Sequence, residues 1–258
     1  VVLPMNTLLK EEELAYLLKD SDSKLLITCR YFEKMVEAVK TQQPNPKVLY
    51  LEDLKDQKLK LFALSLLPKK EAPIKEDDLA VIIYTSGTTG KPKGAMLTHK
   101  NITSNVLACS QVFEGSSKDK FIAVLPMFHS FGMTAGVLLP LYLGGTVITL
   151  KQFKPLETIE TIEKHQATIF LGVPFMYSLL TRVKGHEQSL KSLRLCVTGG
   201  AAMPSEVLKE FENKFKVSIY EGIGLSETSP VIAMNSISKR RIGSVGKAIP
   251  GVEIRIVD

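Results

Sequence analysis

The sequence contains no tryptophan, only three cysteines and only four histidines in 258 residues. Cys29, Cys109 and Cys196 are odd in number, far apart in the sequence and surrounded by apolar neighbours, which is typical of small core residues in a reducing compartment. The histidines are equally dispersed, so neither C-x-x-C nor H-x-x-x-H spacing occurs. We therefore expect no structural zinc site.

Two common catalytic motifs are also missing. The phosphate-binding motif G-x-x-x-x-G-K-[ST] fails around Gly90-Lys91, because Thr85 stands at the first glycine position and Pro92 replaces the hydroxyl residue. The serine-hydrolase motif G-x-S-x-G fails at 224–228, because the segment ends in Thr228. These departures argue against a P-loop hydrolase and a serine hydrolase.

Acidic and basic residues are absent from Phe121 to Leu150, so a membrane span has to be considered. Pro140 and Gly144-Gly145 interrupt this apolar run, and they favour a helix and a strand of ordinary globular length. We therefore expect the run to form core.

The net charge of +6 arises from 33 basic and 27 acidic residues, a balance that favours an anionic ligand such as a nucleotide or coenzyme A. The basic residues are scattered, and the cluster Lys239-Arg240-Arg241 is expected to be a solvated turn. No basic stripe interleaved with aromatic residues is present, so we expect no nucleic-acid partner.

Apolar strands and amphipathic helices alternate along most of the chain, which predicts an α/β fold with parallel β-sheets flanked by helices. Expected helices cover 8–19, 31–40, 98–112, 156–165, 175–183 and 205–215; expected strands cover 24–28, 47–51, 79–84, 121–125, 168–172, 193–197 and 217–220. We expect a first part at 1–78, with a polar, linker-like segment at 52–78, and a ligand-binding core at 79–258.

The densest group of glycines, hydroxyls and lysines lies between Tyr84 and His99, directly after an apolar strand that we expect to be buried on both faces. Backbone amides, hydroxyls and an ammonium group can surround a polyphosphate there. The candidate phosphate-binding residues are Thr85, Ser86, Gly87, Thr88, Thr89, Gly90 and Lys91. A flexible surface turn would have a similar composition.

Unusual loops follow further predicted strands. In a parallel sheet the carboxyl ends of the strands meet at one edge, so we expect Thr85-Ser86-Gly87 and these three segments to converge on one cleft. The segments are Pro126–His129, Gly199-Gly200-Ala201-Ala202 and Glu221-Gly222-Ile223-Gly224. Glu227 follows the last of them. A single carboxylate beside substrate phosphates suits Mg²⁺, although a surface glutamate explains it equally well.

The segment Tyr84–His99 resembles, nearly residue for residue, the signature loop of the adenylate-forming superfamily. Residues 220–228 resemble that superfamily's second core motif, Tyr-Gly-x-Thr-Glu. The resemblance implies that Ser226 contacts the α-phosphate, that Glu227 holds Mg²⁺ and that Ile223 replaces an aromatic residue lying against adenine. It further implies that Gly199–Ala202 flanks adenine and that His129 orients a carboxylate. Lys91, His129, Ser226 and Glu227 are the candidate catalytic residues.

The resemblance is greatest to fatty-acid CoA ligases. It implies a partial amino-terminal domain, using ATP, Mg²⁺ and coenzyme A to convert a fatty acid to acyl-AMP and then acyl-CoA. The family's ribose-binding aspartate, hinge and small domain with the catalytic lysine would lie outside this piece, which would be nearly inactive alone. A cytoplasmic location is expected. Membrane association, peripheral membrane contact and a homodimer stay open.

Three alternatives remain. An acyl-carrier-protein synthetase or an aryl-CoA ligase would use the same adenylating site with a different thiol acceptor or acyl pocket. A non-catalytic nucleotide-binding sensor stays open because of Ile223 and because the domain with the catalytic lysine would lie outside this piece.

Overall fold

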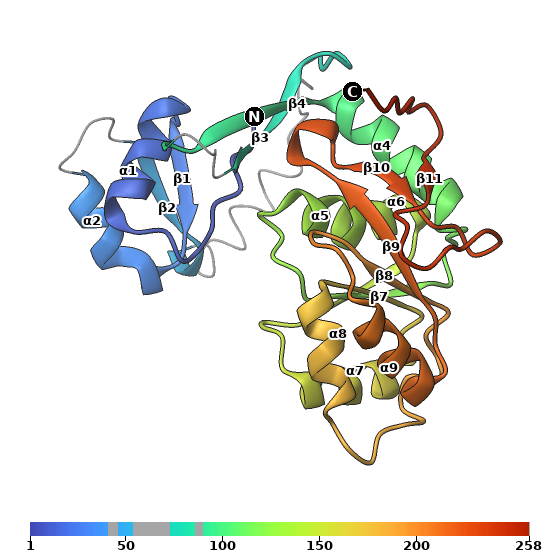
Figure 1. The fold of residues 1–258 in the computed structure, drawn as a ribbon. Coiled ribbons are helices and arrows are strands. Elements are labelled where there is room, and N and C mark those ends of the chain that lie inside the picture. The colour runs from blue at the N-terminus through green and yellow to red at the C-terminus, as the bar shows by residue number, and fades with distance from the viewer. Residues whose placement is uncertain (41–45, 54–72, 86–89, 258) are drawn as a thin grey trace. The chain divides into compact units, whose positions relative to one another are not determined.

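A computed structural model of the chain describes residues 1–40, 46–53, 73–85 and 90–257. These residues form two compact units, one of Met5–Ile74 and the other of Val1–Pro4 with Lys75–Asp258 (Figure 1). Most of the polar segment expected at 52–78 lies outside the described residues.

The smaller unit is a short parallel β-pair with helices. Strand β1 (Leu25–Thr28) pairs with β2 (Lys47–Tyr50), and the chain also forms α1 (Glu11–Asp20), η1 (Arg30–Phe32) and α2 (Glu33–Lys40). Three glutamates occupy the first turn of α1, where they stabilise the positive end of the helix dipole. The apolar faces of the helices and of β1 form a small core of Leu14, Leu18, Leu26, Val36 and Val39.

The larger unit is built around a seven-stranded sheet with the order β11-β10-β9-β8-β7-β5-β6. The strands are β5 (Lys120–Ala123), β6 (Thr146–Thr149), β7 (Ile169–Gly172), β8 (Leu195–Thr198), β9 (Ile219–Gly224), β10 (Val231–Met234) and β11 (Lys247–Ala248). Strands β6, β5, β7, β8 and β9 are parallel, whereas β10 is antiparallel to β9 and β11. The predicted α/β fold is confirmed.

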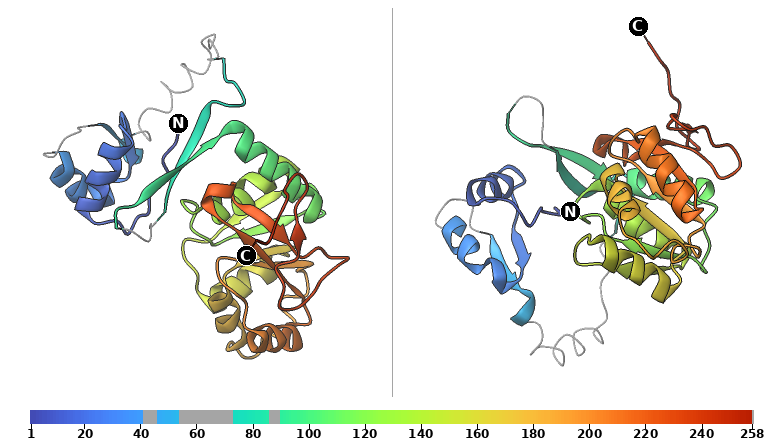
Figure 2. Two further views of the ribbon diagram at one scale, coloured as in Figure 1. Left: turned by 45° about the horizontal axis from the view of Figure 1, so that its top comes forward. Right: turned by 60° about the horizontal axis from the view of Figure 1, so that its bottom comes forward.

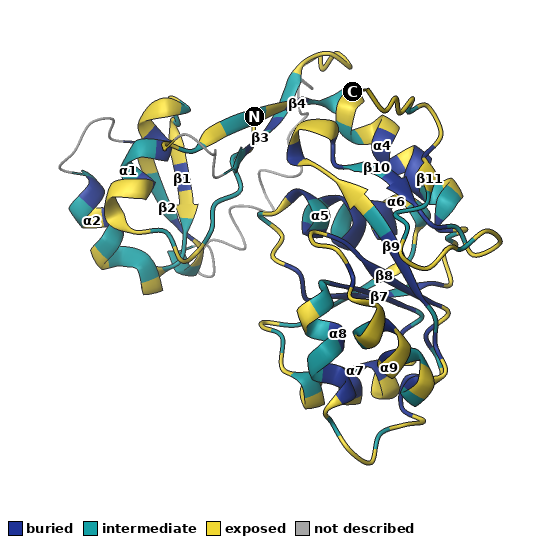
Figure 3. Cartoon of the chain, in the orientation of Figure 1, coloured by how far each residue is buried: buried dark blue, intermediate teal, exposed yellow. Residues whose placement is uncertain are grey.

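Helices cover both faces of this sheet, as Figures 1 and 2 show. One face packs against α4 (His99–Val112), α5 (Ser130–Met133) and α6 (Leu139–Leu143), and the other against α7 (Pro155–His165), α8 (Pro174–Thr181) and α9 (Ser205–Phe215). Side chains alternate along each strand. Ile169 and Leu171 therefore pack on the α4–α6 face of the sheet, whereas Phe170 packs on the α7–α9 face. The central strands are therefore buried on both faces (Figure 3).

The strand before the signature loop differs from its prediction. Strand β3 (Leu79–Thr85) pairs antiparallel with β4 (Lys93–Thr98) in a separate two-stranded sheet. Val81 and Ile83 are buried, but the alternate residues of β3 are partly exposed. The expectation of burial on both faces is wrong, because the chain turns back after the loop and forms a hairpin instead of entering the parallel sheet.

The uncharged run 121–150 forms part of β5, the helical segment from α5 to α6, and β6. The helix ends at Gly144, which has left-handed backbone angles, as predicted. Pro140, however, lies within the helical segment and does not end it. The preceding turn η3 (Thr134–Leu138) is π-helical, an irregularity consistent with the amide that proline lacks. No helix in the described ranges is long and apolar enough to cross a membrane.

Two side-chain expectations have different outcomes. Cys109 and Cys196 are buried free thiols, as expected, and burial raises the pKa of Cys109 to about 12. Arg240 does not belong to a solvated turn. Its guanidinium pairs with Glu212 on α9 and lies over the ring of Tyr220, with its central carbon 5.4 Å from the ring centroid.

Candidate active site

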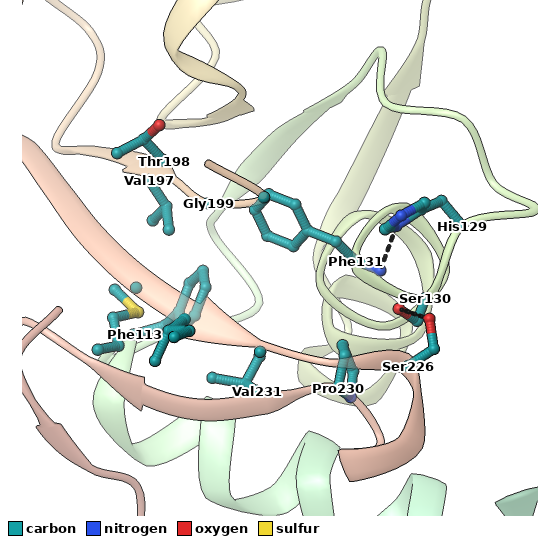
Figure 4. A pocket seen from close by; sticks show the side chains of 15 residues that line it. Phe113, His129, Ser130, Phe131, Val197, Thr198, Gly199, Ser226, Pro230 and Val231 are labelled. Carbon is teal, nitrogen blue, oxygen red and sulfur yellow. Dashed lines mark hydrogen bonds between the residues drawn. The ribbon is translucent and has the colours of Figure 1, made fainter. Parts of the chain in front are cut away.

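A pocket of about 520 Å³, open space at its mouth included, lies at the carboxyl ends of β8 and β9. Figure 4 shows side chains converging on it from several distant parts of the chain. It is lined by Phe113, His129, Ser130, Phe131, Val197, Thr198, Gly199, Gly200, Gly222, Ile223, Gly224, Ser226, Pro230, Val231 and Met234. Of the four loops expected to converge, the structure brings parts of three to this pocket.

His129 stands at the start of α5 and caps it. Its Nδ1 accepts a hydrogen bond from the backbone amide of Phe131 at 3.4 Å (Figure 4). A neutral imidazole that accepts at Nδ1 carries its proton on Nε2, which is then a donor. The turn needs glycine at Gly132, because a Cβ there would lie 2.2 Å from the carbonyl oxygen of Pro126. The sequence therefore fixes this turn, and the turn orients the imidazole of His129.

Ser226 opens the short helix η4 (Ser226–Thr228), which connects β9 to β10. The Leu225 amide donates to the carbonyl of Pro230 at 3.0 Å and closes this turn. Only glycine fits at Gly224, where a Cβ would lie 2.4 Å from the same carbonyl oxygen. Ser226 is buried, and its hydroxyl lies 3.1 Å from that of Ser130 (Figure 4).

Glu227 is exposed and lies outside the pocket lining, beside the β3–β4 hairpin. The hydroxyl of Thr85, the last residue of β3, donates to its carboxylate at 3.3 Å. This contact joins the start of the signature loop to the second motif. Lys91 and Gly90 are exposed and do not line the pocket, and Ser86, Gly87, Thr88 and Thr89 lie outside the described residues.

Only the first half of the glycine-rich segment after β8 lines the pocket. Gly199 and Gly200 line the pocket, whereas Ala201 and Ala202 are exposed outside it. A Cβ on Gly199 would lie 3.5 Å from the ring of Phe131, an ordinary van der Waals contact, so this neighbour does not require glycine.

Glu221 does not line the pocket. Residues 222–224 continue β9, which the sequence predicted to end at 220, because β10 supplies hydrogen-bond partners as far as Gly224. By strand alternation Glu221 faces the α7–α9 side, and its carboxylate accepts from the amide of Met203 at 3.0 Å. Gly222, Ile223 and Gly224 do line the pocket, and Ile223 is 45% exposed.

Sequence reasoning missed several residues that build this site. Asn105 on α4 is buried, donates to the carbonyl of Val231 at 2.8 Å and accepts from its amide at 3.2 Å. The pair fixes β10 against α4 beside the pocket. A polar residue on the buried face of α4 was the only available signal for Asn105, and Phe113 carries no distinguishing pattern in the sequence.

The model of the family described as AMP-binding enzyme matches residues 1–258. The chain belongs to the AMP-binding enzyme family. A long-chain-fatty-acid–CoA ligase of Bacillus subtilis is 35% identical over 292 residues, covering 99% of this chain and 52% of the relative. A mitochondrial malonate–CoA ligase of Mus musculus, ACSF3, is 30% identical over 287 residues, covering 100% of this chain and 46% of the relative.

Among solved structures, ATP-bound MatB from Rhodopseudomonas palustris superimposes with a TM-score of 0.85 at 30% identity, covering 97% of this chain and 50% of that one. The chain thus spans about half the length of the family members that it matches. This similarity confirms that the fold is that of an adenylate-forming amino-terminal domain.

Proposed function

We propose that this chain is the ATP- and acid-binding part of an AMP-forming CoA ligase that activates a fatty acid. A carboxylate oxygen of the acid attacks the α-phosphorus of ATP, giving acyl-AMP and pyrophosphate. The thiol of coenzyme A then attacks the acyl carbon and AMP leaves. The observation that carries the proposal is one pocket in which His129 and Ser226 flank an apolar wall in a member of this family.

The composition of the pocket favours an uncharged acyl group. Its lining among the described residues contains no Lys, Arg, Asp or Glu, and Phe113, Phe131, Val197, Val231 and Met234 supply apolar walls. A second carboxylate, as in malonate, would lose water there without gaining a cationic partner, which is strongly unfavourable. Methylene groups gain roughly 0.8 kcal/mol each on burial. A fatty acid therefore fits this wall better than a diacid.

The polar groups at the edge of the pocket match the reacting ends of the substrates. Protonated at Nε2, His129 can donate to the carboxylate and orient one of its oxygens toward ATP. The Ser226 hydroxyl can donate to an α-phosphate oxygen. Both substrates are anions, so fixed donors at these positions stabilise the charge that develops on the pentavalent phosphorus. Lys91 would approach the phosphates from the signature loop.

Glu227 fits the role of a magnesium ligand that acts together with nucleotide phosphates. Its carboxylate is exposed, beside the Thr85 hydroxyl, and no group of three or more His, Cys, Asp or Glu residues that could hold a metal occurs in the described ranges. Mg²⁺ is commonly bound through one or two carboxylates plus substrate phosphates. When bound, it would neutralise phosphate charge and favour departure of pyrophosphate.

The test is pyrophosphate release by the protein as its gene encodes it, with ATP and a panel of octanoate, palmitate, benzoate and malonate. We expect release with the fatty acids, little with malonate, and conversion to acyl-CoA when coenzyme A is added. Benzoate as the best substrate would favour an aryl-CoA ligase, and transfer to carrier protein alone would favour an acyl-carrier-protein synthetase. ATP binding without release for any acid would overturn the proposal and favour a nucleotide sensor.

A further inference from the structure

Ser130 lines this pocket, and the proposed chemistry gives it no role. It follows His129 directly and is only 2% exposed. Its hydroxyl lies 3.1 Å from that of Ser226, and 96 residues separate the two in the sequence. Ser226 is itself 9% exposed. A buried hydroxyl pair thus joins the turn that carries the histidine to the turn that carries Ser226 and Glu227 (Figure 4).

We propose that Ser130 is a positioning residue that sets the direction of the Ser226 hydroxyl. This inference rests on the proposed function, in which Ser226 donates to an α-phosphate oxygen. A serine hydroxyl has one proton to donate and two lone pairs that accept. Once the proton of Ser226 is directed at the anion, only a lone pair is left for Ser130, so Ser130 donates to Ser226.

Such a bond has two consequences for the reaction. It holds the freely rotating Ser226 hydroxyl with its proton toward the phosphate before ATP arrives, which is the preorganisation that makes such donors effective. It also fixes the His129 turn relative to the Ser226 turn, so the carboxylate and the α-phosphorus keep a productive separation. Small errors in that separation lower rates strongly.

A merely structural role for Ser130 predicts a different pattern. In that case loss of the hydroxyl would lower the free energy of unfolding and leave the turnover of folded enzyme unchanged. Ser189 provides a matched control in this chain. It is also a buried serine, 7% exposed, whose hydroxyl donates to Glu163 at 3.0 Å, and it does not line the pocket.

The experiment is a double-mutant cycle in the protein as its gene encodes it, with Ser130→Ala, Ser226→Ala and the double variant. The readouts are kcat for pyrophosphate release, KM for ATP and the midpoint of urea unfolding. We expect Ser130→Ala to lower kcat roughly three- to tenfold, the typical effect of one buried hydrogen bond, with a smaller change in KM. In the Ser226→Ala background the same substitution should change kcat less than twofold, because the partners act as a unit.

Two further variants sharpen the result. Ser130→Thr retains the hydroxyl and should restore most of kcat, whereas Ser189→Ala should shift the unfolding midpoint without altering kcat. If Ser130→Ala does not fold, Ser130→Cys, a poorer donor of similar size, should show the same dependence on Ser226.

If the parent protein is active, two results would overturn the inference. In the first, Ser130→Ala leaves kcat unchanged. In the second, Ser130→Ala lowers kcat by the same factor whether or not the Ser226 hydroxyl is present. Either result leaves the proposed function intact. A parent that releases no pyrophosphate with any acid overturns both.

Discussion

Asp119 and Arg194 form a largely buried ion pair, and its loss should strongly lower the free energy of unfolding. Asp119 is 3% exposed. It lies directly before the first residue of β5, and Arg194 lies directly before the first residue of β8. Arg194 donates through Nε and Nη2 to both carboxylate oxygens at 2.8 and 2.7 Å, and Thr168, ahead of β7, donates at 2.7 Å. The Ser116 amide donates at 2.8 Å. The pair thus ties together the amino ends of three parallel strands, at the opposite end of the sheet from the pocket.

The protonation of Asp119 gives the magnitude and its pH dependence. Burial alone would raise its pKa, but the hydrogen bonds from Arg194, Thr168 and Ser116 outweigh burial and lower the pKa from 3.8 to about 2. Since one pKa unit corresponds to roughly 1.4 kcal/mol, ionised Asp119 stabilises the fold by about 2 kcal/mol. Because the pKa of Asp119 is lower in the folded state, its contribution to the free energy of unfolding is fully present at pH values above its unfolded-state pKa of about 4. This contribution is lost as the pH falls toward the folded-state pKa of about 2.

Removal of Arg194 should lower the free energy of unfolding by more than the stabilisation from ionised Asp119, because the buried carboxylate of Asp119 is left without its cation. We expect Arg194→Met to lower the free energy of unfolding by about 3 to 5 kcal/mol at pH 7. The matched control is Lys154→Met, which breaks the exposed ion pair to Glu157, 3.3 Å long, and should cost about 1 kcal/mol or less.

Urea unfolding of the parent, both variants and Asp119→Asn, from pH 7 to pH 3, measures these free energies. The advantage of the parent over Asp119→Asn should shrink by roughly 1 kcal/mol at pH 3, where the unfolded carboxylate is mostly protonated and the folded one is not. Equal costs for Arg194→Met and Lys154→Met, or a pH-independent gap between the parent and Asp119→Asn, would refute the reasoning.

Three further predictions concern the pocket in the protein as its gene encodes it. Ile223→Tyr should tighten ATP binding several-fold without changing the preferred acid, because aromatic stacking adds on the order of 1 kcal/mol; unchanged or weaker binding in calorimetry would show that Ile223 does not lie against the base. Glu227→Gln should abolish the ATP-dependent part of Mg²⁺ binding, and equal titrations in variant and parent would contradict the assigned ligand. Phe113→Leu should open the apolar end of the pocket and favour longer fatty acids by about fourfold for each added methylene that is buried; an unchanged chain-length profile in kcat/KM would show that Phe113 does not limit the acyl group.

The sequence by itself determined the elements and the family. Helix Ser205–Phe215 has the predicted bounds, and Thr98 caps α4 as predicted, its hydroxyl accepting from the amide of Asn101 at 3.1 Å. Such features depend on neighbouring residues, through the period of apolar side chains and through local capping. The resemblance carried by 84–99 and 220–228 is local for the same reason, and the family match over the whole chain confirms it.

Only the tertiary structure decided which of these residues meet. β9 continues to Gly224 because β10 pairs with it, β4 exists because it returns along β3, and Glu221 faces Met203 across the sheet from the pocket. The Ser130–Ser226 and Asp119–Arg194 contacts join residues 96 and 75 positions apart. No local pattern specifies such pairs, because their geometry is set by the packing of the helices and strands that carry them.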